Sequence, residues 1–282
     1  MKVKQIIFAA ILSAILASCT TTNYYQIYKV MPVKPFEIAS DSLVYEDENC
    51  KVYYDFWGNG GNMGFKIYNK TDKNIYLNMA ESFFILNGTA YDYYKNRVFA
   101  KSSSSSFTSS YSSSAGYNKV GFNQINSFIA SIVAISSTTT KAATTSSESS
   151  VSYNENMIVC IPSKSAKSIF EYNITDNIYR DCDLLKFPNK RQIKPMSFSV
   201  TESPFVFSNR IAYSIESSET LIKFENEFYV TEISNYPQKE VTEEKYEEFC
   251  SEKGTRKLRY FKNASADKFY IEYTKKGSTF KH

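Results

Sequence analysis

The residues of this sequence that could do chemistry are its carboxylates, because the only histidine is His282, the last residue. Without an internal imidazole, a Ser-His-Asp triad or a Cys-His pair has no base. Asp181 and Asp183 flank Cys182, and four more acids surround the first predicted strand: Asp41, Glu46, Asp47 and Glu48. Two carboxyls at a defined separation suffice to hydrolyse a glycoside. Both clusters lie in predicted turns, where acidic side chains are usually solvated or bind calcium, so a carboxylate-dependent glycoside hydrolase is the less favoured alternative.

Other catalytic and cofactor motifs are weak or missing. The pattern S-x-x-K occurs at Ser265–Lys268 and Ser278–Lys281, but neither match begins a predicted helix. The sequence contains no G-x-x-x-x-G-K-[ST] or G-x-G-x-x-G phosphate loop. A net charge of +4 over 282 residues is too small for a strongly basic nucleic-acid binder. We expect no catalytic residue, no cofactor, no metal and no nucleic-acid partner.

The N-terminus carries the most specific motif. Lys2 and Lys4 precede an apolar run from Ile6 to Ala17, which is too short to span a bilayer and is typical of a secretory signal peptide. The run ends in Leu16-Ala17-Ser18-Cys19, which resembles the bacterial lipobox. This resemblance implies cleavage of residues 1–18, acylation of Cys19 with chains such as palmitate, and anchoring of the protein to a membrane through that lipid.

The residues around this motif indicate a place in the cell envelope. By resemblance to lipoprotein sorting rules, Thr20 in place of Asp favours the outer membrane. The chain lacks an acidic cluster after Cys19, which favours the periplasmic side over surface display. The motif, with the Tyr- and Asn-rich β pattern that follows it, resembles lipoproteins of the Bacteroidota. The resemblance implies an envelope location and no activity.

Alternating hydrophobicity predicts an all-β protein. Cys50, Val52, Tyr54 and Phe56 fall on one face of a strand, and Asn87-Gly88 is a strong hairpin signal. Short strands about ten residues apart predict a mainly antiparallel β-sandwich, immunoglobulin-like or related, over residues 35–238. Residues 19–34 are interpreted as a lipidated tether.

A low-complexity insertion interrupts the predicted sandwich at residues 101–150. Of these 50 residues, 24 are Ser or Thr, which bury too little apolar area to order a chain. Apolar residues at helical spacing predict an amphipathic helix over 121–135, which would either pack on the parent domain or bind a membrane or partner.

A small α+β appendix is predicted at the C-terminus, over residues 239–282. Thr242 as N-cap, Glu243 and Glu244 in a first turn, and Gly254 at the end indicate a short helix. A β-hairpin is expected after it.

Four cysteines remain after Cys19: Cys50, Cys160, Cys182 and Cys250. An even number in an exported protein allows one or two disulfides, whereas buried free thiols are the equally favoured alternative. Asp41-Ser42-Leu43 resembles the O-glycosylation motif of exported Bacteroidota proteins, which makes Ser42 a candidate modification site.

Aromatic residues suggest a ligand. Trp57 and the group Tyr91, Tyr93 and Tyr94 are candidate glycan contacts, because sugar faces stack on exposed rings. The alternative, which we favour, is that these rings belong to the core. The sequence therefore predicts a lipid-anchored cell-envelope protein with a non-catalytic binding or structural role, whose partner is an envelope protein or a glycan. A glycan-binding accessory lipoprotein is the alternative.

Overall fold

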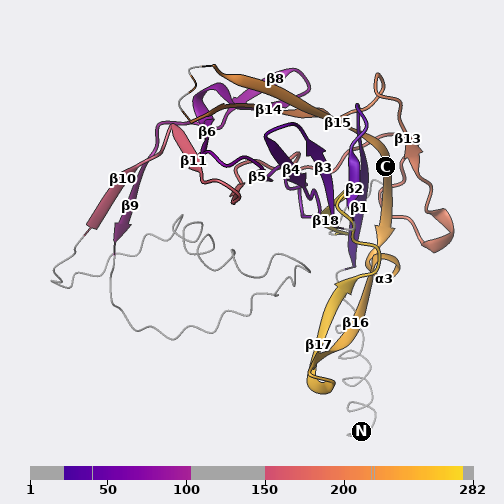
Figure 1. Ribbon diagram of the computed structural model, residues 1–282. Helices are drawn as coiled ribbons and strands as arrows, with labels where there is room; N and C mark the ends of the chain where they lie inside the picture. Colours follow the sequence, from indigo (N-terminus) through magenta and orange to yellow (C-terminus); the bar gives the residue numbers. More distant parts are fainter. Residues whose placement is uncertain (1–21, 40, 103–149, 217, 219, 276–282) are drawn as a thin grey trace, which may run out of the picture.

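The computed structural model describes residues 22–39, 41–102, 150–216, 218 and 220–275 (Figure 1). The predicted signal peptide, Cys19, His282 and the helix predicted over 121–135 lie outside these ranges.

Two antiparallel sheets pack face to face. In the larger sheet the strand order is β11 (Ile158–Ile161), β6 (Ile75–Asn78), β14 (Val206–Ile215), β15 (Ile222–Pro237), β1 (Asn23–Pro32) and β18 (Lys268–Thr274). Its additional strands are β7 (Phe83–Leu86), which pairs with β14 and β8 (Thr89–Asp92), and β13 (Met196–Ser197), which pairs with β15. The smaller sheet has the order β12 (Ala166–Ile169), β5 (Phe65–Asn69), β4 (Cys50–Tyr54), β3 (Ser42–Glu46) and β2 (Glu37–Ala39). This arrangement confirms the predicted all-β, sandwich-like fold.

Aromatic side chains fill the space between the sheets. The predicted face Cys50, Val52, Tyr54 and Phe56 is buried, with each residue 0% exposed. Tyr54 lies edge-on to Phe228 of the larger sheet, with ring centroids 5.0 Å apart. Each such ring removes a large apolar area from water, so these contacts are the main source of cohesion between the layers.

The predicted tether is wrong, because most of it is strand β1. β1 pairs with β15 on one side and with β18 on the other. Tyr24, Tyr25 and Tyr28 are all buried. The tyrosines belong to a central strand with both neighbours in place, and their partners lie more than 200 residues away in the sequence, as in the pairs of Tyr24 with Pro237 and Tyr28 with Ile233.

The predicted C-terminal appendix is also partly wrong. Residues 242–249 form strand β16 (Thr242–Phe249), not a helix, and pair with β17 (Glu252–Phe261); the only helical turn there is α3 (Gln238–Val241). Glu243 and Glu244 face Tyr260 and Arg259 across this ribbon, so cross-strand pairing overrides the N-cap pattern. The last strand, β18, is not part of a local hairpin but joins β1 in the larger sheet.

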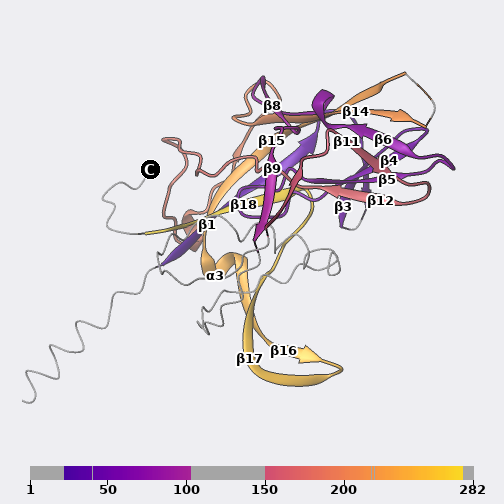
Figure 2. The same ribbon diagram turned by 90° about the vertical axis from the view of Figure 1, so that its left-hand side faces the viewer.

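Two ribbons project from the sandwich (Figures 1 and 2). One is β16–β17, and the other is β9 (Val98–Ser102) with β10 (Ser150–Asn154), which brackets the Ser/Thr-rich insertion. At the base of β9–β10, Arg97 forms ion pairs with Glu155 and Glu171. Two 3₁₀ turns, η1 (Met79–Glu81) and η2 (Lys190–Gln192), complete the described elements.

Two glycines with positive φ provide a matched test of this packing. Gly61 has φ +75°, and a Cβ there would lie 2.8 Å from Ile174 Cδ1 and 2.9 Å from Phe269 Cγ. Gly88, in the Asn87-Gly88 hairpin, has φ +81° and no atom within 4 Å of the same position.

We expect Gly61→Ala to lower the free energy of unfolding by about 2–5 kcal/mol, the sum of a left-handed backbone cost and overpacking. Gly88→Ala adds no clash and should cost only about 1–2 kcal/mol. Urea denaturation of the two variants measures the difference. Equal losses would contradict the close packing of this loop against β18.

Candidate functional site

A cavity of about 170 Å³ lies on the face of the larger sheet that points away from the core. Its floor is formed by β18, β1 and β15, and its walls by Trp57 and by residues between α3 and the start of β18. The lining residues are Ile27, Lys29, Trp57, Glu232, Ser234, Tyr236, Glu240, Val241, Phe261, Asn263 and Lys268.

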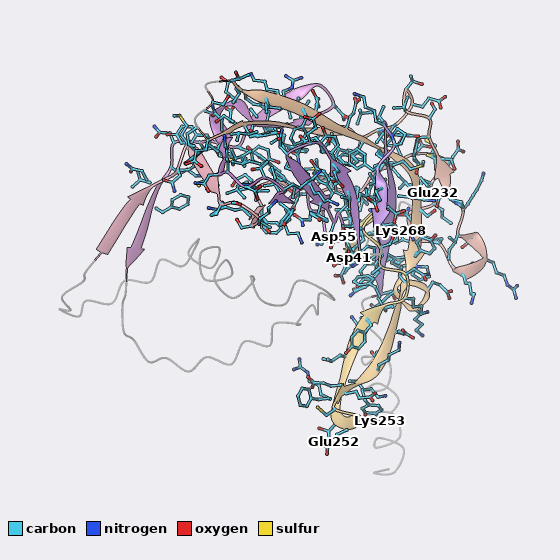
Figure 3. The ribbon with its side chains drawn as sticks, viewed as in Figure 1. Asp41, Asp55, Glu232, Glu252, Lys253 and Lys268 are labelled. Carbon is cyan, nitrogen blue, oxygen red and sulfur yellow. The ribbon has the colours of Figure 1, made fainter. Side chains whose placement is uncertain are left out.

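Strand register brings the polar residues of the floor together. Lys29 lies directly opposite Lys268 of β18 and Glu232 of β15. Directly opposite residues of antiparallel strands share one face of the sheet, so two amines and one carboxylate form a row across three strands. Figure 3 shows Glu232 and Lys268 in this part of the sheet, close to where the β16–β17 ribbon begins.

The charges of this row find no partner within the described part of the chain. The side chains of Lys29, Glu232 and Lys268 make no ion pair with any described residue. The other cavity carboxylate, Glu240, pairs with Lys190 at 3.4 Å between Nζ and Oε2. The cavity thus offers two amines and one carboxylate that are open to a ligand.

An aromatic wall stands beside the charged row. The indole ring of Trp57 lies 4.9 Å from the Phe261 ring and 5.2 Å from the Tyr270 ring, measured between centroids. The Trp57 loop is fastened to β18, because Gly60 N donates to Tyr270 O at 2.8 Å and Tyr270 N donates to Gly58 O at 3.1 Å. The wall is therefore held by backbone bonds to the same strand that supplies Lys268.

Ser234 adds a buried hydroxyl without a partner. The residue is 1% exposed, and its hydroxyl oxygen makes no hydrogen bond within the described residues. It lies opposite Ile27, another cavity residue, and so on the cavity side of the sheet. An unpaired buried hydroxyl costs about 1–3 kcal/mol, and because this oxygen is closed off from solvent, a ligand in the cavity does not reach it.

These groups suit a small ligand with one apolar face and several polar atoms. An aromatic wall stacks on the apolar face of a ring, while amines and a carboxylate bond its substituents. A volume of about 170 Å³ is smaller than typical pockets for drug-sized ligands, and it matches a single ring.

The predicted glycan contacts do not gather at one surface. Trp57 lies in the cavity wall and is partly buried. Tyr93 is a core residue, 2% exposed, whose hydroxyl donates to Asn209 Oδ1 at 2.6 Å, so its prediction as a contact is wrong. Tyr91 and Tyr94 lie in and just after β8, far from α3 in Figures 1 and 2.

The predicted acidic clusters have structural partners. Asp47 accepts from the backbone N–H of Asn49 and Cys50 and from the hydroxyl of Tyr213. Glu46 pairs with Lys51 and Lys70, and these cations lower its pKa. Asp181 accepts from the backbone of Asp183. Among the described residues, no group of three or more His, Cys, Asp and Glu side chains is arranged to hold a metal ion.

The modification sites predicted from sequence are partly corrected. All four described cysteines are free thiols, so none of the predicted disulfides is formed. Cys160, Cys182 and Cys250 are exposed, and only Cys50 is the predicted buried thiol. Ser42 is the first residue of β3, pairs with Ala39 of β2 and is 6% exposed; this burial does not favour glycosylation of the folded chain.

Sequence reasoning missed most of the cavity. The sequence pattern places Lys29 in the tether and Phe261 in the C-terminal hairpin with residues 268–274, while Glu232 and Ser234 carry no local signal. Only the register of β18, β1 and β15 brings these residues together, and that register joins segments from both ends of the chain.

Comparison with known proteins assigns the chain to no family. No protein-family model matches the chain, and neither does any curated protein or solved structure. Within the described ranges, no helix has the length and apolar character needed to cross a membrane.

The cysteines give a prediction about reactivity. Burial and the neighbouring Asp47 raise the pKa of the Cys50 thiol far above its usual range, so it stays protonated and unreactive. We expect a thiol reagent to modify Cys160, Cys182 and Cys250 quickly in the native protein and Cys50 only after unfolding. Mass spectrometry of the labelled peptides measures this order. Rapid labelling of Cys50, or resistance of two exposed cysteines until a reductant is added, would contradict it.

Proposed function

We propose that this chain is a lipid-anchored cell-envelope protein with a non-catalytic binding role, and that the Trp57 cavity is its binding site. The observation that carries the binding role is the combination of an aromatic wall with charges that pair with no described residue, on the outer face of the larger sheet. The anchor is supported by the Leu16-Ala17-Ser18-Cys19 motif and the apolar run before it. These motifs favour the outer membrane, with the folded part on the periplasmic side.

The cavity supports binding better than catalysis. Hydrolysis of a glycoside needs two cooperating carboxyls and room for the groups on both sides of the bond. Glu240 is engaged by Lys190, which leaves Glu232 as the one unpaired carboxylate among the described cavity residues. The hydrolase alternative therefore has less support.

A glycan is the ligand class that one observation favours. Trp57 lines the cavity together with Lys268 and Lys29, so one sugar ring could stack on the indole and bond the amines at once. Two amines against one free carboxylate favour a sugar that carries a carboxylate of its own.

The anchor is tested by replacing Cys19. We expect Cys19→Ala to abolish metabolic labelling with palmitate and to release the protein from the membrane fraction, because only the thiol can take the lipid. Cys182→Ala, which removes an exposed cysteine of the folded part, is the matched control and should keep the label. Labelling that survives Cys19→Ala would refute the anchor at this residue.

The binding site is tested by the fluorescence of Trp57, the only tryptophan in the chain. We expect galacturonic acid to change Trp57 emission saturably and galactose to do so more weakly, because only the acid pairs with the lysines. Lys268→Met should weaken binding of the acid by about tenfold or more, the value of one charged hydrogen bond.

Tyr91→Ala is the control for this titration, because it removes an exposed ring outside the cavity. It should leave the binding curve unchanged. Emission that responds to neither sugar, or an equal response in the Lys268→Met variant, would argue against a glycan in this cavity.

A further inference from the structure

The β16–β17 ribbon, called the arm below, exposes aromatic residues at its far end. Phe249 is 81% exposed and Tyr246 is 51% exposed. Cys250 and Ser251 both have positive φ, 49° and 70°, and form the tight turn at the tip. Seven residue steps from Thr242 to Phe249 give the arm a reach of about 23 Å. Figures 1 and 2 show it projecting away from the sandwich.

The segment before β1 is much shorter than the arm. Three residue steps separate Cys19 from Thr22, so these two residues lie at most about 11 Å apart. From Thr22 onward the chain belongs to the sheet: Lys275 N donates to Thr22 O at 3.2 Å, and Asn23 pairs with Thr274. If Cys19 carries the lipid, as the proposed function holds, the start of β1 lies close to the membrane surface.

The arm begins at that same end of the sheet. Tyr24, the second residue of β1, pairs with Pro237, and α3 and then the arm follow directly. The Tyr25 ring contacts Phe261 at the base of the arm, with centroids 5.4 Å apart. Both views show the arm and the start of β1 on the same side of the body.

We infer that the tip of the arm is a second membrane contact, in which Phe249 and Tyr246 enter the interfacial region of the bilayer that holds the lipid on Cys19. The inference rests on the proposed anchor. Cys19 and Thr22 are at most about 11 Å apart, whereas the arm reaches about 23 Å, so the tip meets the membrane surface when the anchored protein tilts toward its arm. Exposed aromatic rings gain free energy at a membrane interface.

The charges at the tip define the kind of surface. Glu247, Glu248 and Glu252 lie near Phe249, with Lys253 beside them, and Lys257 Nζ lies 5.2 Å from the centre of the Tyr246 ring, so acids outnumber bases at the tip by one. Figure 3 shows Glu252 and Lys253 at the far end of the arm. A strongly anionic surface would repel this tip, so the arm suits a lipid surface of zwitterionic headgroups.

The test places a tryptophan at the tip of the full-length lipidated protein. Phe249→Trp is made in a Trp57→Phe background, so that the new indole is the only one, and the protein is reconstituted into phosphatidylcholine vesicles with brominated acyl chains. Tyr91→Trp in the same background is the matched control, because Tyr91 is an exposed ring on β8, far from the arm. Circular dichroism confirms that both variants are folded.

We expect the indole at position 249 to shift to shorter wavelength and lose most of its emission to the bromines, while the indole at 91 keeps its emission. Adding phosphatidylglycerol should weaken the quenching at position 249. Bound, lipidated protein without quenching at 249 would overturn this inference and leave the anchor intact. An unmodified Cys19 by mass spectrometry, with no vesicle binding, would overturn both. A blue shift that grows with protein concentration in the absence of vesicles would mean that the tip docks on another copy, and would also overturn the inference.

Discussion

Strand β1 lies between β15 and β18, so segments from the two ends of the described chain are hydrogen-bonded side by side. This pairing places the core face of β1 against the smaller sheet and its other face under Trp57. Tyr28 on the core face stacks on Phe269 of β18, with centroids 4.3 Å apart and planes within 7°. The cavity, the base of the arm and the entry of the chain from Cys19 all depend on this one strand.

A buried amide fixes the register of β1. Gln26 is 0% exposed, and its Nε2 donates to Asn235 Oδ1 and to Tyr179 O, each at 2.9 Å. Its Oε1 accepts from Tyr179 N at 2.6 Å and from the hydroxyl of Tyr28. A shift of one residue would move Gln26 to the other face and leave all these groups unpaired, at about 1–3 kcal/mol for each one. The same register sets Lys29 beside Glu232 and Lys268, so core chemistry determines what the outer face can bind.

Local patterns predict single strands and tight hairpins well. The alternation in 50–56 and the Asn87-Gly88 turn each depend on neighbours within about ten residues, and both appear in the structure. The positions of β1 and β18 are harder to predict, because each strand pairs with a segment far along the chain. Pro32 and Pro35 also make the end of β1 resemble a linker. The helix predicted from Thr242 is wrong for another reason. Thr242-Glu243-Glu244 satisfies helix-capping rules, but these residues pair instead with the basic strand β17. The cavity depends both on distant strand pairing and on the base of the arm, so Trp57 is the one cavity residue that the sequence indicates as a ligand contact.

The base of the arm and the wall of the cavity share the Phe261 ring. A two-stranded ribbon is only marginally stable by itself in water, so the order of the arm depends on its base. There, Phe261 packs on Trp57 and Tyr25, Lys262 N donates to Val241 O at 2.9 Å, and Thr242 Oγ1 donates to Gln238 O at 3.0 Å. A ligand held between Trp57 and Lys268 would touch the ring that fixes the base of the arm. The cavity wall and the base of the arm therefore share Phe261, so the packing that orders the arm also shapes the cavity.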